Sequence, residues 1–221
     1  MTGTLAVVGG EPFTDACTFN RRLVEAAGAT EVTVLPTAAA FEHPDRLVEA
    51  AKEHFGAIGV GVTALEVLTR ADAMLQANAD TVREASVVYL VGSSAMHARP
   101  TLLQTPVWDG LVAAWHAGAT VIGSDAGAQI LGDPMVDDRG AAFTVGLGLV
   151  ERIAFVPRYA TWSEDALQRL HQMTNPDLAL IGLDDSTAAI RSPEGSWMAE
   201  GAGSVHVRVG TEPIELADLV R

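Results

Sequence analysis

The sequence predicts an α/β fold: a doubly wound, mostly parallel sheet with helices on both faces and an antiparallel edge formed by its C-terminal part. Apolar, strand-like segments alternate with helical patterns over the first 130 or so residues. The run "VVYLV", Val87–Val91, is apolar throughout, which is typical of a central parallel strand covered on both faces. Near the C-terminus, "LALIGLDDSTAAI" and "GSVHVRVG" read as strands joined by the turn-rich "RSPEGS", which favours an antiparallel edge.

Each strand and helix in this order is predicted by features of its own segment of the sequence. Short apolar or β-branched runs predict strands at Leu5–Val8, Glu31–Leu35, within Ile58–Leu68, at Val87–Val91 and at Ala119–Ile122. Capping residues, a proline at a first turn and apolar residues three or four apart predict helices from Thr14 to Ala27, from Pro44 past Phe55, over Arg70–Asn78, over Thr101–Ala117 and over Ser163–Met173. With no repeat, linker or low-complexity segment, we expect a single domain over residues 1–221.

Composition excludes several classes of function. The net charge of −14 disfavours nucleic acid and anionic membranes as partners. The only cysteine, Cys17, rules out an internal disulfide and a cysteine-based metal cluster. No signal peptide and no apolar run of membrane-spanning length is found, so a cytoplasmic location is the default. No cofactor motif is present, and a homodimer is a weak default for this fold.

The stretch "VIGSDAGAQIL", Val121–Leu131, is the strongest candidate site. It reads as a strand, a tight turn and a helix, with Gly123 and Gly127 placed two before and two after Asp125. Hydrolases use this elbow to present a nucleophile, and the small residues let strand and helix approach. Backbone N–H groups just after the turn, at Ala126, could then stabilise an oxyanion. Because sites in such sheets lie beyond the carboxyl ends of the strands, the loops at 9–12, 36–40, 92–96 and 123–127 should converge there.

The surroundings of the elbow resemble a known family. "GSDAGAQILGDPM" is similar to the Gly-Thr-Ser-Ala-Gly-Ala elbow of peptidase family S51, which includes cyanophycinase and dipeptidase E. "VVYLVGSS", "VGLGLVERIAFVPRY" and "IGLDDSTAAI" resemble further segments of that family, in the same order, so that the likeness runs from Leu5 to about Val209. The resemblance implies a fold like that of class I glutamine amidotransferase domains.

The same resemblance places unexpected residues at the catalytic positions. The family serine nucleophile corresponds to Asp125 and the family histidine base to Arg158, while Asp137 or Asp138 matches the family acid. The substrate loop Gly-Asp/Asn-Gln corresponds to Gly92, Ser93 and Ser94. We therefore expect Asp125 and Arg158 to form a charge-assisted ion pair in place of the dyad, and expect no ordinary serine-peptidase activity. The family pocket would then serve a small ligand or short peptide.

Other interpretations of the same residues remain open at this point. Ser124 is a weak candidate nucleophile because it precedes the tip of the elbow. Asp125 could act as a carboxylate nucleophile with His97, after the "VGSSAM" loop, as base, in which case the family implies an active hydrolase of aspartyl dipeptides or related amides. A metal site from Asp125, Asp137, Asp138 and His97 has no supporting ligand spacing, so we expect none. Asp125 as a plain helix cap, Arg158 as a surface residue, and a non-catalytic structural or oligomeric partner are the remaining alternatives.

Overall fold

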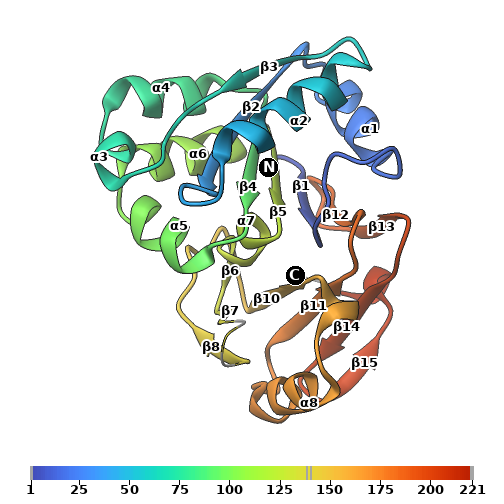
Figure 1. The fold of residues 1–221 in the computed structure, drawn as a ribbon. Helices are drawn as coiled ribbons and strands as arrows, with labels where there is room; N and C mark the ends of the chain where they lie inside the picture. The colour runs from blue at the N-terminus through green and yellow to red at the C-terminus, as the bar shows by residue number, and fades with distance from the viewer. Residues whose placement is uncertain (1, 138, 140, 220–221) are drawn as a thin grey trace.

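A computed structural model describes residues 2–137, 139 and 141–219, and its main feature is a seven-stranded sheet (Figure 1). The strands follow the order β13-β12-β1-β5-β4-β2-β3. The five strands at one side are mutually parallel: β1 (Leu5–Val8), β5 (Thr120–Ser124), β4 (Val87–Gly92), β2 (Glu31–Ala38) and β3 (Gly61–Ala64). The other two, β12 (Thr187–Arg191) and β13 (Trp197–Gly201), form the antiparallel edge that the sequence predicts.

Helices cover both faces of this sheet, also as predicted. One face carries α1 (Phe19–Ala26) and α2 (Pro44–Gly56), and the other carries α3 (Arg70–Ala73), α4 (Gln76–Glu84), α5 (Ala95–Leu102) and α6 (Pro106–His116). Alternate residues of β1 show the two-sided packing: Leu5 and Val7 join the core beneath α5 and α6, while Ala6 and Val8 join the core beneath α1 and α2. This burial on both faces explains why the central strands are apolar throughout.

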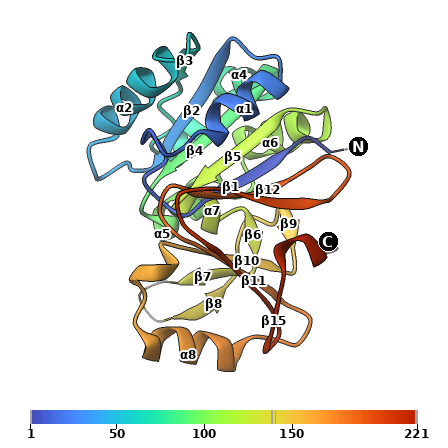
Figure 2. The same ribbon diagram turned by 90° about the vertical axis from the view of Figure 1, so that its right-hand side faces the viewer.

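A second sheet was not predicted. It has the order β15-β14-β11-β10-β6-β9, with strands at Glu212–Ile214, Val205–Val209, Ala179–Leu183, Ile153–Pro157, Gly132–Asp133 and Val150–Glu151. Figure 2 shows it beneath the first sheet, with α8 (Glu164–Met173) on its outer side. A hairpin of β7 (Met135–Asp137) and β8 (Ala142–Thr144), and two short 3₁₀ turns at Tyr159–Thr161 and Leu216–Asp218, complete the structure described.

The C-terminal strands were expected to form one antiparallel edge, but the structure divides them between the two sheets. "LALIGLDDSTAAI" is not one strand: it breaks after Leu183, so that β11 belongs to the second sheet and β12 to the first. "GSVHVRVG" forms β14, which pairs with β11 and not with the main sheet. Both halves of the broken segment are buried and apolar, so the hydrophobic pattern alone does not reveal which sheet each joins.

Several boundaries also differ from those expected. The first helix begins at Phe19, because the Thr14 hydroxyl contacts Ser186 and Cys17 instead of capping a helix. Strand β2 continues through Pro36, where an irregularity in its pairing with β4 accommodates the missing N–H.

The two long helices expected between residues 70 and 117 are each broken. The Arg70–Asn78 segment contains all of α3 and the start of α4, with Met74 and Leu75 between them. The Thr101–Ala117 segment holds the end of α5 and all of α6, which Thr105 caps through a bond from the N–H of Trp108. Within the described ranges, no helix is long and apolar enough to cross a membrane.

Candidate functional site

Asp125 stands on a sharp turn between β5 and α7 (Ala126–Gln129), at the carboxyl end of the central strands. Its backbone has φ 54° and ψ −120°, a conformation that residues other than glycine rarely adopt. Its N–H donates to the carbonyl of Val8 (3.1 Å), and its own carbonyl accepts from Ala128 (2.9 Å) and Gln129 (3.1 Å). The turn is thus fixed by the neighbouring strand and by the helix that follows, which is the elbow geometry that the sequence predicts.

The two glycines of the elbow have the role expected of them. A Cβ atom at Gly127 would collide with the carbonyl of Leu90 on β4, and one at Gly123 would press against the backbone of Gly127. Strand, turn and helix therefore pack at backbone contact distance, which leaves no room for a side chain at either glycine. Asp125 occupies the N-cap position, but its side chain makes no capping hydrogen bond. Helix capping alone does not explain the residue.

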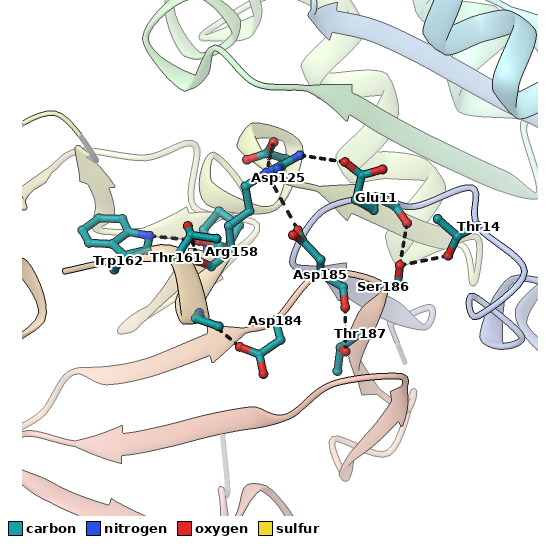
Figure 3. A network of polar contacts seen from close by, with 12 residues as sticks. Glu11, Thr14, Asp125, Arg158, Thr161, Trp162, Asp184, Asp185, Ser186 and Thr187 are labelled. Atoms are coloured by element: carbon teal, nitrogen blue, oxygen red, sulfur yellow. Dashed lines mark hydrogen bonds and ion pairs between the residues drawn. The ribbon is translucent and has the colours of Figure 1, made fainter. Parts of the chain in front are cut away.

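Arg158 follows β10 and turns back toward the elbow (Figure 3). Its backbone is left-handed, with φ 53° and ψ 37°, and its N–H donates to the carbonyl of Gly9 (3.0 Å). Its Nε donates to Oδ2 of Asp125 at 3.1 Å. The Asp125 side chain is 19% exposed and that of Arg158 is 41% exposed, so the pair is partly shielded from solvent. The structure brings together the two residues that the sequence resemblance assigns to the nucleophile and base positions.

Two further carboxylates lie against the same guanidinium, and sequence reasoning missed both. Glu11 Oε1 is 3.6 Å from Nη2 of Arg158, and Asp185 Oδ1 is 3.9 Å from Nε. Burial alone would lower the pKa of Arg158, but the charges of Asp125, Asp185 and Glu11 outweigh it and raise that pKa. The sequence does hold a feature that could have pointed to each carboxylate: Glu11 lies in a loop expected at the site, and Asp185 follows an apolar strand.

A cavity of about 250 Å³ opens beside this ion-pair cluster. Five residues expected at the site line it: Gly92, Ser93, Ser124, Asp125 and Arg158. Glu11 and Glu42 add two carboxylates to its wall, and Ser93 Oγ donates a hydrogen bond to Oε2 of Glu42. The loops after β1, β2, β4 and β5 therefore meet at one place, as expected for the carboxyl edge of a parallel sheet.

Comparison with known proteins agrees with this geometry. The sequence model of peptidase family S51 matches residues 6–195. The chain belongs to peptidase family S51. Among solved structures, it is similar to a peptidase from an acI-B1 Actinobacterium, with 26% identity and a TM-score of 0.84 over 97% of this chain and 93% of that one. It also has the fold of a putative peptidase E protein from Listeria monocytogenes EGD-e, with 18% identity and a TM-score of 0.73 over 92% and 100% of the two chains.

Of the two residues expected as the catalytic acid of this S51 chain, the structure describes Asp137, which pairs with Arg139. Asp137 ends β7, and its carboxylate accepts two bonds from the Arg139 side chain, from Nε (3.0 Å) and Nη2 (2.9 Å). The Arg139 hydrogen bonds lower the pKa of Asp137. Asp138, the other candidate, lies outside the described residues. In the described part of the S51 chain, the carboxylate contacts of Arg158 come from Glu11, Asp125 and Asp185.

The remaining expected residues surround the elbow in supporting positions. Ser94 precedes α5, and its N–H donates to the carbonyl of Ala38 (2.9 Å). Ala126 is fully buried at the first position of α7. His97 lies on α5, where its Nε2 is 2.9 Å from the carbonyl oxygen of Leu68 and it does not line the cavity. Over the ranges described, no group of three or more His, Cys, Asp or Glu side chains is arranged to hold a metal ion.

Proposed function

We propose that this S51 family member has no ordinary serine-peptidase activity, because an ion pair occupies the positions of the nucleophile and the base. The observation that carries the proposal is the 3.1 Å contact between Nε of Arg158 and Oδ2 of Asp125. The pair sits on an intact elbow, beside a cavity that can still receive a small ligand or a short peptide. The S51 architecture would thus be kept as a binding site.

Each half of the pair opposes serine-peptidase chemistry. Arg158 cannot accept a proton at any working pH, since a guanidinium stays protonated and has no acceptor. Asp125 brings a negative charge to the place where a tetrahedral intermediate would develop its own. In subtilisin, loss of the serine or the histidine of the triad lowers kcat by a factor of about 10⁶. We expect a loss of peptidase activity of the same order here.

The alternative nucleophiles find less support. Ser124 is only 1% exposed, and its Oγ has no hydrogen-bond partner among the described residues, so no base is in place to take its proton. A carboxylate nucleophile at Asp125 would need a separate base for the second step. His97, the histidine expected to serve, has its Nε2 against the Leu68 carbonyl. An active hydrolase therefore remains the second choice.

The test is a hydrolysis assay with purified full-length protein, using aspartyl dipeptides and cyanophycin as substrates. The expected result is no release of products above the uncatalysed rate. Turnover that Asp125→Ala abolishes, and that the distant control Asp80→Ala leaves unchanged, would overturn the proposal. Asp80 is a suitable control because its carboxylate pairs with Arg83 on the exposed surface of α4.

A further inference from the structure

A network of polar side chains ties the loop after β1 to the two helices beside it. Asn20, on α1, is fully buried, and its Nδ2 donates to the carbonyl of Pro12 (2.8 Å). The same Nδ2 lies 3.0 Å from Nε2 of His54 on α2, and the hydroxyl of Tyr89 on β4 donates to Oδ1 of Asn20 (3.4 Å). Pro12 lines the cavity beside the elbow, so this network fixes part of the wall of the candidate site.

The donors and acceptors of this network require His54 to be neutral. The carbonyl of Pro12 can only accept, so Asn20 must present its NH₂ group to it, which leaves Oδ1 to accept from Tyr89. The same NH₂ group can offer only a hydrogen to Nε2 of His54, so Nε2 is the lone-pair nitrogen of an uncharged ring. His54 also forms a hydrogen bond with the backbone of Phe13. Two neighbouring loop residues therefore depend on one imidazole.

A second proton on His54 would break this arrangement. A hydrogen on Nε2 would point at a hydrogen of the Asn20 NH₂ group across a gap of 3.0 Å. Turning the Asn20 amide over would satisfy the ring, but it would set Oδ1 against the Pro12 carbonyl, and neither oxygen can donate. In either case a buried polar group loses its partner, which is costly. The loop avoids this cost by moving the Pro12 carbonyl away into solvent.

The surroundings of His54 make its ring the group that responds to pH. The ionisable side chains that share its cavity or its hydrogen-bond network, among the described residues, are Asp15, Cys17, Arg21, Glu53 and Tyr89. Of all these groups, the imidazole is the one that ordinarily changes charge between pH 5 and 8. Burial lowers the pKa of His54, and this effect outweighs the opposing ones of the Asp15 charge and the Phe13 hydrogen bond. Burial also raises the pKa of Tyr89, so its hydroxyl stays uncharged.

We propose that His54 is a pH-sensitive latch: when neutral it holds Pro12 and Phe13 in place, and when protonated it releases them. Because Pro12 lines the cavity beside the elbow, the release changes one wall of that cavity at mildly acidic pH. The Ser186 hydroxyl, which donates to the carbonyl of Glu11 (3.1 Å), still holds the preceding part of the loop (Figure 3), so the release is local. The inference goes beyond the proposed function, since it holds whether or not the elbow is catalytic.

The only cysteine, Cys17, reports on this release. Its thiol is buried, shares a cavity with Phe13 and His54, and donates to the carbonyl of Glu11 (3.3 Å). Its reaction rate with 4,4′-dithiodipyridine is measured in the folded full-length protein and in the urea-unfolded protein. The ratio of the unfolded rate to the folded rate gives the protection of the thiol. Between pH 7.5 and 5 this protection should fall at least about 5-fold, and at most about 30-fold, the limit for a released imidazole with its ordinary pKa.

Matched variants separate local release from unfolding. In His54→Gln, the amide oxygen can accept from Asn20 at either pH, so the protection of Cys17 should stay constant, whereas His116→Gln, on the exposed end of α6, should keep the wild-type fall. In Cys17→Ser with Ala154→Cys, the thiol lies in the core of the second sheet and reports global unfolding, so its protection at pH 5 should exceed that of Cys17.

Three results would overturn the latch: constant protection of Cys17 in the wild type, an equal fall in His54→Gln, or equal protection of the two thiols at pH 5. The wild type also gives a check that needs no variant. In ¹⁵N-labelled protein, the amide resonance of Phe13 should shift with the same midpoint pH as the His54 ring, and a different midpoint would refute the coupling.

Discussion

Replacing Arg158 by methionine tests the central feature of the site, the guanidinium shared by three carboxylates. The change keeps much of the side chain's length and removes its charge. Asp125, Glu11 and Asp185 then lose the guanidinium that they share, to which their contacts are 3.1, 3.6 and 3.9 Å. We expect a clear loss of stability, because acidic groups gathered by the fold would repel.

The magnitude follows from the three contacts. A hydrogen bond to a charged group contributes about 1.5–3 kcal/mol, but Arg158 is 41% exposed, and solvent screening reduces the Asp125 contact to roughly 1–2 kcal/mol. The two longer contacts are those of surface ion pairs, at about 0.2–1 kcal/mol each. The expected loss in unfolding free energy is therefore about 1.4–4 kcal/mol, equivalent to a fall in Tm of roughly 3–16 °C for a chain of this size.

The assay is urea and thermal unfolding of wild type, Arg158→Met, Asp125→Asn and the double variant. The double-mutant cycle should give a coupling of about 1–2 kcal/mol between Arg158 and Asp125. Arg83→Met is the matched control: Arg83 is 44% exposed, and Asp80 is the one carboxylate it pairs with among the described residues, so its loss should cost under about 1 kcal/mol. If Arg158→Met were as stable as Arg83→Met, the reasoning about a shared counter-charge would be wrong.

Three further outcomes are expected. Asp125→Ser with Arg158→His should become labelled by a fluorophosphonate at position 125, whereas wild type should not; absence of labelling would mean that the elbow does not present the introduced serine. Gly127→Ala should cost roughly 1–3 kcal/mol in urea unfolding because its Cβ meets backbone, while Gly56→Ala, in open space on α2, should be neutral or stabilising; equal effects would contradict the elbow contacts. Burial lowers the pKa of His54 below 6.5, so the unfolded state binds more protons than the folded state. The free energy of unfolding should therefore fall as the pH drops below about 6.5. In unfolding measured from pH 7.5 to 5, His54→Gln should reduce this dependence of the free energy on pH, and an unchanged dependence would refute the role of His54.

Much of the first sheet could be predicted because its signals are local. The apolar run Val87–Val91 and the short strand Leu5–Val8 are found where the pattern places them, and the glycines around Asp125 predict the elbow. The second sheet could not be predicted in this way. Strand β11 and strand β12 are both buried, so period and hydrophobicity are the same for either sheet, and only pairing over long range separates them.

Some residues of the candidate site could also be predicted from the sequence, and others could not. Asp125 and Arg158 could be paired from the sequence because the family resemblance assigns both positions. Glu11 and Asp185 could not, because an acidic residue in a loop looks the same whether it faces solvent or a distant arginine. Their contacts to Arg158 depend on β1, β10 and β12 meeting in space, and no spacing along the chain encodes that meeting.

The position of β12 has a consequence for the order in which the molecule is completed during synthesis. Strand β1 emerges first, yet its place in the sheet lies between β5 and β12, and β12 begins at Thr187. The loop carrying Glu11 is also tied to that late segment, since the N–H of Ser186 donates to the carbonyl of Gly10 (2.8 Å). A ribosome-bound chain that has built all five parallel strands would still lack Arg158, which lines the cavity, and the Ser186 bond that holds the loop of Glu11. Ligand binding should therefore appear only after nearly the whole chain has been made.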